Sequence, residues 1–203
     1  LSSGCHQIDF VDEKLFVTDT YNNRVIVFDH FGNMVQSYYP LGMLNKGRQS
    51  SNYGHINSIF YHNASFYLMC HNETIKTGRN SKILKCDKNF NIQESIKTDA
   101  KNAHNILLNN GDTFYCDSFH FSFVKNDKKV VETKYFTRGL SMTDDVILFG
   151  GSAISKRKNR NKAKGAIYLL DKNLQLIEII KMPAMVQEIR SIDVKDYSIS
   201  NNS

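Results

Sequence analysis

Three histidines recur at an even spacing and are the residues best suited to chemistry. His6, His55 and His104 each open a similar short segment, and both intervals between them are 49 residues. Arg138 and Glu188 open two further segments of the same kind. Neutral imidazole is the commonest metal ligand, and three ligands with one open position are typical of catalytic zinc or iron. The spacing therefore predicts that His6, His55 and His104 hold a divalent metal, either zinc or iron.

Glu188 and Arg138 are the candidate catalytic residues. Glu188 is placed to act as a fourth ligand or as a general base beside a metal-bound water. Arg138 is suited to hold a carboxylate or phosphate group by bidentate hydrogen bonds. A structural interpretation stays open beside this one, because polar residues at strand ends also bond water and backbone groups.

Two long loops are expected on the same face as these residues. The loop at 152–165 is strongly basic, and the loop at 71–81 begins with a histidine. A basic rim attracts a small anionic substrate, although such charge runs are also common in solvated loops. Nucleic acid is disfavoured because the basic run has no interleaved aromatic residues. The residues predicted to bind substrate are Lys156, Arg157, Lys158 and His71.

The elements that position these residues read as short strands. Runs of β-branched and aromatic residues alternate with polar turns, and helical periodicity is absent. Four runs per repeat predict the four-stranded blades of a β-propeller. An open β-sandwich is the alternative. The expected blades cover approximately residues 4–40, 53–98, 102–134, 137–182 and, incompletely, 187–200.

This pattern predicts one all-β propeller domain over residues 1–203, with about five blades and six left open. The incomplete last repeat implies that strands closing the ring come from upstream of Leu1 or from elsewhere, because a propeller must cover its edge strands. An aspartate marks the turn between third and fourth strands in each full repeat. Aspartate suits such turns because it bonds its own backbone. The turn aspartates are Asp29, Asp87, Asp127 and Asp171.

One segment resembles a known family. Residues Thr20 to Gly32 contain Asn-Arg, then a short apolar run and then Phe-Asp-x-x-Gly, which is similar to the repeat signature of NHL propellers. The resemblance decays in later repeats and implies the fold only, because propellers host many functions. One enzyme of that kind, the lyase that makes peptide amides, is similar in placing histidines around a metal in its channel.

Composition sets wide limits. The chain has 203 residues, a net charge of +6 and no apolar run of the ~20 residues that a membrane span needs. Residue 1 is Leu, which indicates a processed or truncated segment. The four cysteines stand singly without any CxxC pair, which leaves the compartment unknown and slightly favours the cytoplasm.

Three functions follow from these observations. The first is a metal-dependent hydrolase or lyase that acts on a small anionic molecule at a histidine-lined channel mouth. The second is a non-enzymatic NHL-like scaffold that binds a protein or glycan on the same rim. The third is an accessory domain whose chemistry lies in an upstream domain. The sequence leaves open which of them is right, and it does not determine an oligomeric state.

Overall fold

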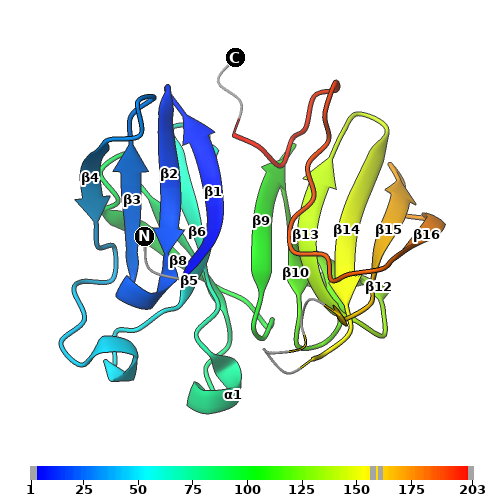
Figure 1. Cartoon of the computed structure of the whole chain (residues 1–203), viewed down its shortest axis with the longest axis horizontal. Coiled ribbons are helices and arrows are strands. Elements are labelled where there is room, and N and C mark those ends of the chain that lie inside the picture. The colour runs from blue at the N-terminus through cyan, green and yellow to red at the C-terminus, as the bar shows by residue number, and fades with distance from the viewer. Residues whose placement is uncertain (1–3, 156–158, 160–161, 201–203) are drawn as a thin grey trace. The chain divides into compact units, whose positions relative to one another are not determined.

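The described part of the chain is built of β-strands. A computed structural model describes residues 4–155, 159 and 162–200. It contains four antiparallel sheets of four strands each, in which consecutive strands are neighbours (Figure 1). Such a four-stranded meander is a propeller blade. The fold is therefore an all-β propeller fold, with four blades in the described residues.

The chain divides into two compact units. Unit 1 comprises Leu1–Asn102 with Ile199–Ser203, and unit 2 comprises Ala103–Ser198. The strands of unit 1 are β1 (Cys5–Val11), β2 (Lys14–Asp19), β3 (Arg24–Phe28), β4 (Met34–Tyr38), β5 (Ile56–His62), β6 (Ser65–Cys70), β7 (Lys82–Cys86) and β8 (Ile92–Lys97). The strands of unit 2 are β9 (His104–Asn109), β10 (Asp112–Asp117), β11 (Ser122–Lys125), β12 (Lys128–Glu132), β13 (Phe136–Met142), β14 (Val146–Ser152), β15 (Gly165–Asp171) and β16 (Leu176–Met182).

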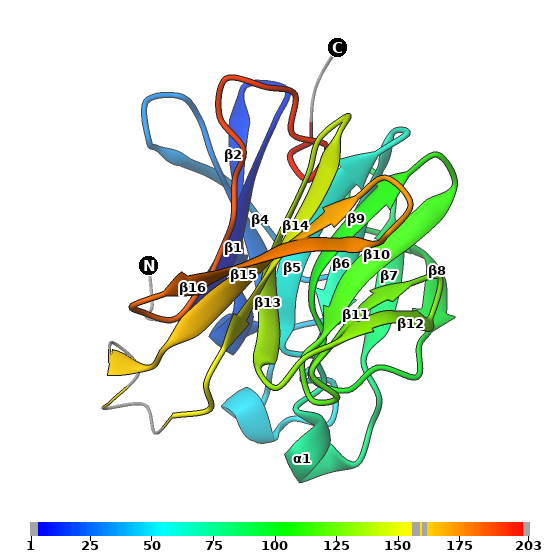
Figure 2. The same cartoon turned by 90° about the vertical axis from the view of Figure 1, so that its right-hand side faces the viewer.

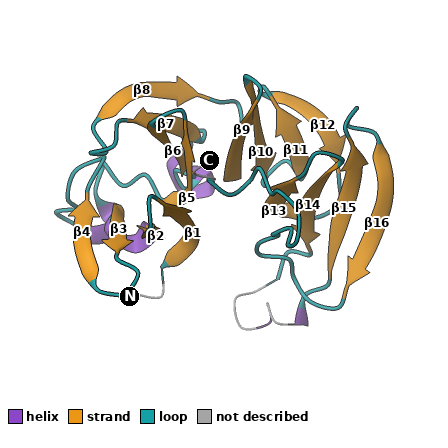
Figure 3. Ribbon diagram, turned by 90° about the horizontal axis from the view of Figure 1, so that it is seen from above, coloured by secondary structure: helices purple, strands orange, loops and turns teal. Residues whose placement is uncertain are grey.

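The core of unit 1 lies between its two blades. Their first strands, β1 and β5, contact each other (Figure 3). Alternating apolar residues of the inner strands fill the space between the sheets, as the period of a strand requires. Three phenylalanine rings form its aromatic part, with Phe16 and Phe90 at 4.8 and 4.5 Å from Phe66 between ring centroids. This packing fixes the blades that carry the histidines of unit 1.

The core of unit 2 is centred on β14. Phe149 is fully buried, and its ring stacks on Phe123 at 4.9 Å and on Tyr168 at 4.8 Å. The strands β13 to β16 run side by side in order (Figure 2). The residue after Phe149 is Gly150. A Cβ atom at this position would lie 2.3 Å from the carbonyl oxygen of Arg138. Gly150 is thus required by a close backbone approach.

The predicted aspartate turns are confirmed in three blades. Asp29 Oδ1 accepts hydrogen bonds from the backbone N–H groups two and four residues later, at 3.0 and 2.8 Å. Asp87 and Asp171 repeat this arrangement. The side chain thereby closes the turn that links the third strand of each of these blades to the fourth.

The prediction of five or six blades is wrong. Residues 187–200 contain no strand, although Ile189 to Val194 were expected to start a fifth blade. The physical reason is Asp196, whose carboxylate accepts hydrogen bonds from the N–H groups of Ser191 and Ser198 at 2.8 and 2.9 Å. It also accepts one from the Ser141 hydroxyl at 2.9 Å. The bonds from Ser191 and Ser198 occupy backbone N–H groups that a strand ladder would need.

The expected absence of helix also fails locally. Residues Thr74–Thr77 form a single helical turn, α1, in the connection from β6 to β7, and it lies beyond the strand ends in Figure 1. No helix in the described ranges is long and apolar enough to cross a membrane. Glu73, the residue that precedes this turn, belongs to the site described below.

Thiol accessibility tests the packing of the blades. Cys70, Cys86 and Cys116 are buried, whereas Cys5 is exposed. Burial raises the pKa of Cys70 and of Cys86 to about 12, and it also raises the pKa of Cys116. We expect one thiol per chain to react with a disulfide reagent at pH 8, and Cys5→Ser to remove that reaction. Fast labelling of a second thiol in the folded protein would contradict this packing.

Candidate functional site

The predicted site residues are divided between the two units. His6 and His55 belong to unit 1, whereas His104, Arg138 and Glu188 belong to unit 2. A metal site that joins His6, His55 and His104 therefore stays a prediction. Among the described residues, no group of three or more His, Cys, Asp or Glu is arranged to hold a metal ion.

The even spacing in sequence is also not an even register in the sheets. Cys5 pairs with the end of β2, and Ile56 pairs with the end of β6. The residue after the paired Cys5 is His6, whereas the residue after the paired Ile56 is Asn57. His6 therefore lies inside β1, but His55 lies one residue before the start of β5. Bulges near these pairs add a residue and shift the register.

His6 and His55 nevertheless meet inside unit 1. Their ring centroids are 5.1 Å apart, with the rings nearly perpendicular. His71, from the end of β6, stacks on His55 at 4.4 Å. Two further side chains, Tyr53 and Glu73, complete what we call the unit 1 histidine cluster: His6, Tyr53, His55, His71 and Glu73.

His55 is the centre of this cluster. Its side chain is largely buried, and its Nδ1 atom lies 3.2 Å from the Tyr53 hydroxyl and 3.4 Å from Glu73 Oε1. Its backbone has a φ of 52°, in the left-handed region that only a few per cent of non-glycine residues adopt.

Glu73 is held as a carboxylate by two cationic groups, Lys76 and Arg48. Burial raises its pKa, but hydrogen bonds from Lys76 and Arg48 outweigh this effect and lower the pKa below its usual value. The Lys76 ammonium lies 2.9 Å from Oε2. The backbone N–H of Glu73 donates to His71 Nδ1 at 3.0 Å. A charged carboxylate beside His55 Nδ1 favours a proton on that nitrogen.

Arginine side chains border the cluster. The Arg48 guanidinium lies 4.7 Å from the Tyr21 ring and 5.8 Å from the Tyr53 ring. Arg79 donates to the carbonyl oxygen of Tyr53 at 2.9 Å. Burial is the main cause that raises the pKa of Tyr53 to about 12, so its hydroxyl stays protonated near neutral pH. The cluster therefore combines a buried imidazole, a carboxylate and cationic neighbours that suit an anion.

The charge on Glu73 predicts a pH-dependent stability. Its folded-state pKa is depressed below the unfolded value of ~4.3. Its contribution is therefore present above that pH and lost as the pH falls through the folded pKa. We expect Glu73→Gln to be less stable than the wild type at pH 7 and the difference to shrink below about pH 4. Urea unfolding at several pH values measures the difference in the free energy of unfolding, and the exposed Glu94→Gln is the control. A difference that does not change with pH would contradict the prediction.

The predicted residues of unit 2 lie in hydrogen-bond networks of their own. His104 Nδ1 lies 2.8 Å from Ser118 Oγ, and its ring meets Phe136 edge-on. Glu188 accepts from the Asn105 amide at 3.3 Å and pairs with Arg190 at 3.0 Å. Burial raises the pKa of Glu188 above its ordinary value, against the opposing charges of Arg190 and Arg138.

The substrate-binding predictions have different outcomes. Lys156, Arg157 and Lys158 lie outside the described residues. His71 belongs to the unit 1 histidine cluster, stacked on His55. Sequence reasoning missed Tyr53, Glu73 and Arg48. The one available signal was the position of Glu73 in the polar 71–81 loop, two residues after His71.

Comparisons with known proteins support the fold. No family model matches the chain, and no curated protein matches it by sequence. Virginiamycin B lyase from Staphylococcus aureus matches with a TM-score of 0.55, 12% identity, and coverage of 89% of this chain and 56% of the lyase. Its catalytically inactive histidine-to-alanine variant with quinupristin matches with a TM-score of 0.55, 14% identity and coverage of 89% and 57%.

A protein of unknown function from Bacteroides caccae matches with a TM-score of 0.53, 11% identity, and coverage of 91% of this chain and 85% of that one. The chain thus spans just over half the length of the two lyase structures. Since fold can be shared without shared function, these similarities show that the chain has a β-propeller fold like that of virginiamycin B lyase.

Proposed function

We propose that unit 1 carries an acid–base site in which His55 transfers a proton during elimination or hydrolysis of a small anionic substrate. The observation that carries this proposal is the contact of His55 Nδ1 with both Glu73 and Tyr53, at 3.4 and 3.2 Å. A carboxylate beside one imidazole nitrogen orients the ring and favours the basic, unprotonated form of the other nitrogen. His71 and His6 pack against the ring and fix its orientation.

The chemistry follows from these roles. In an elimination, His55 Nε2 takes the proton from a carbon next to a carbonyl group. The electron pair of that C–H bond becomes the new C=C bond, and the leaving group departs with the electrons of its own bond. Glu73 stabilises the imidazolium, which then gives its proton to the leaving group or to water. Arg48 is paired with Glu73, so Arg79, which donates to backbone carbonyl groups, is the group that suits the substrate's negative charge.

The structural relatives are consistent with this assignment. A histidine-to-alanine variant of virginiamycin B lyase is described as catalytically inactive, so a propeller of this kind depends on a histidine. The resemblance of Thr20 to Gly32 to NHL repeats points to the same broad class of propellers. Within that class we favour a lyase or hydrolase over a binding scaffold, because His55 is buried and has a carboxylate partner.

A metal-dependent site stays a second form of the same proposal. It would use His6, His55 and His104 as ligands to a divalent metal, with Glu188 and Arg138 as catalytic residues. Since the described residues contain no metal-holding group, we derive no step through a metal. The two forms differ in their reliance on unit 2, because only the metal site needs His104.

A binding scaffold is the second candidate function, and one observation favours it. Four apolar residues of the edge strand β16 are exposed, with Leu176, Ile177, Ile179 and Ile180 between 40 and 56% accessible. Exposed apolar edge strands are sites of strand pairing with other chains. A protein partner on β16 would leave the unit 1 histidine cluster without a role.

A substrate screen with matched variants tests the proposed function. The screen contains small carboxylate esters, and it follows both elimination and ester cleavage. Any activity found is compared between the wild type, His55→Gln and His104→Gln. Loss in His55→Gln alone supports the metal-free acid–base site, and loss in both supports the metal-dependent form. Full activity in His55→Gln would overturn the proposal.

A further inference from the structure

Unit 1 has a second concave site at the other end of its strands. A pocket of about 310 Å³ opens between its two blades, which is at the small end of the ~300–1,000 Å³ range of ligand sites. His6 is the second residue of β1, whereas Val11, which lines the pocket, ends it. Val11 is five residue steps along the strand from His6, or about 17 Å. The pocket is therefore distinct from the unit 1 histidine cluster.

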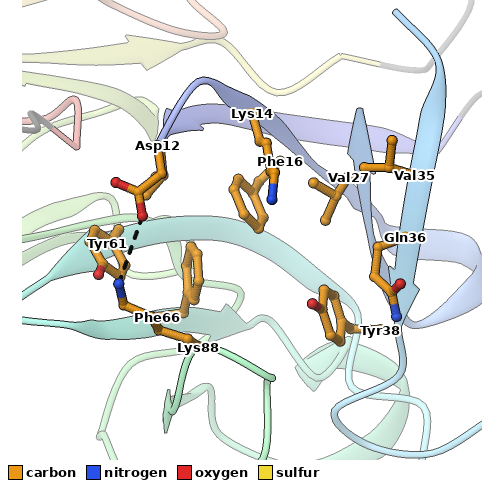
Figure 4. Close-up of a pocket in the computed structure, with 11 residues that line it drawn as sticks. Asp12, Lys14, Phe16, Val27, Val35, Gln36, Tyr38, Tyr61, Phe66 and Lys88 are labelled. Atoms are coloured by element: carbon orange, nitrogen blue, oxygen red, sulfur yellow. Dashed lines mark ion pairs between the residues drawn. The ribbon is translucent and has the colours of Figure 1, made fainter. Parts of the chain in front are cut away.

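Its interior is aromatic and apolar (Figure 4). Phe16 and Phe66 form the buried floor, with ring centroids 4.8 Å apart. Tyr61 packs on Phe66 at 4.8 Å, and Tyr38 of β4 lines the pocket and packs on Phe90 at 4.7 Å. Phe16 and Phe66 are buried, whereas Tyr38 and Tyr61 are only partly buried. Ring surface of the two tyrosines favours a planar aromatic ligand through offset or edge-to-face contacts.

The mouth of the pocket is polar and carries net positive charge. Lys14 and Lys88 line it together with Asp12 and Gln36. Lys88 Nζ lies 3.7 Å from Asp12 and 5.7 Å from the centre of the Tyr61 ring. Two ammonium groups against one carboxylate leave one positive charge to be matched. An anionic group at the edge of an aromatic ligand would match it while the rings occupy the interior.

We propose that this pocket binds a small planar aromatic molecule that carries a single carboxylate. The aromatic floor supplies apolar contact, and Lys14 and Lys88 supply the charge. A neutral aromatic molecule would lack the ionic contact, and an aliphatic acid would lack the stacking. The proposal is independent of the acid–base role of His55.

Calorimetric titration with naphthalene-2-carboxylate tests the proposal, with naphthalene-2-carboxamide as the neutral isostere. For a ligand of about 13 non-hydrogen atoms, the usual ligand efficiency corresponds to a Kd of about 1 mM or lower. We expect Lys14→Gln combined with Lys88→Gln to weaken carboxylate binding about fivefold and to leave carboxamide binding unchanged. The exposed Lys46→Gln serves as the charge control.

A second pair of variants tests the location without disturbing the core. Val35 lines the pocket and Met34, its neighbour in β4, does not; both are exposed. Val35→Trp should fill the pocket and abolish binding, whereas Met34→Trp and His55→Gln should bind as the wild type does. The proposal would be overturned by any of three results. These are no saturable binding of the carboxylate, equal binding of the carboxylate and the carboxamide, or full binding by Val35→Trp.

Discussion

Replacing Phe149 by alanine is expected to destabilise unit 2 by about 3–5 kcal/mol, the usual cost of removing a buried phenylalanine ring. Phe149 is 0% accessible, and its ring lies between Phe123 and Tyr168 in a continuous stack. The substitution removes both stacking contacts and leaves a cavity that the backbone of β14 cannot close. Because native domains are stable by only ~5–15 kcal/mol, much of the stability of unit 2 would be lost.

Urea unfolding followed by far-ultraviolet circular dichroism measures this effect. Phe119→Ala is the matched control, because Phe119 is 41% accessible and lies outside the stack. We expect the control to change the free energy of unfolding by about 0.5 kcal/mol or less. Equal effects of the two substitutions would show that the stack does not hold the unit together.

Replacing His55 by glutamine is expected to lower kcat by about 10²–10⁴-fold on any substrate that unit 1 turns over, the usual contribution of a general base. Glutamine keeps a polar side chain of similar length but does not exchange a proton. Glu73→Gln should give a smaller loss, because Glu73 acts on the substrate only through the orientation and charge of His55.

Folding controls separate this loss from a loss of structure. Each variant is compared with the wild type by circular dichroism and by its urea midpoint. The exposed His30→Gln is the histidine control, since His30 lies in the turn between β3 and β4. A loss in His30→Gln as large as that in His55→Gln would contradict a specific role for His55.

Local chemistry made much of the fold predictable from the sequence. The continuous apolar run within Arg24–Phe28 predicts a buried third strand, and its three interior residues are buried. The Asp29 turn follows from the ability of aspartate to bond the backbone two and four residues later, and those bonds are present. These features depend on neighbours in the chain, so a sequence pattern reveals them.

The blade count was not predictable in the same way. Residues Ile189 to Val194 read as a strand, but the decisive group is Asp196, which bonds Ser191 and Ser141. Ser141 is 55 residues away. No local pattern shows that a carboxylate will take the hydrogen bonds that a fifth blade would need.

The candidate site was predicted only in part. The histidine spacing pointed to His55, and His6 does lie beside it. The partners Tyr53 and Glu73 were missed because they reach His55 through a loop and a helical turn that begins at Thr74. The approach of Glu73 to His55 depends on the path of residues 71–81, which has no periodicity to read, whereas Tyr53 lies two residues before His55.

The tautomer of His55 tests the central claim most directly, and it needs no substrate. The two ring nitrogens of each histidine are distinguished by ¹⁵N NMR of labelled protein at neutral pH, with His55→Gln to assign the signals. Our account predicts that His55 carries its proton on Nδ1, facing the carboxylate of Glu73, and that Glu73→Gln weakens this preference. A proton on Nε2 of His55 in the wild type would contradict the account, because Nε2 could not then accept a proton from a substrate.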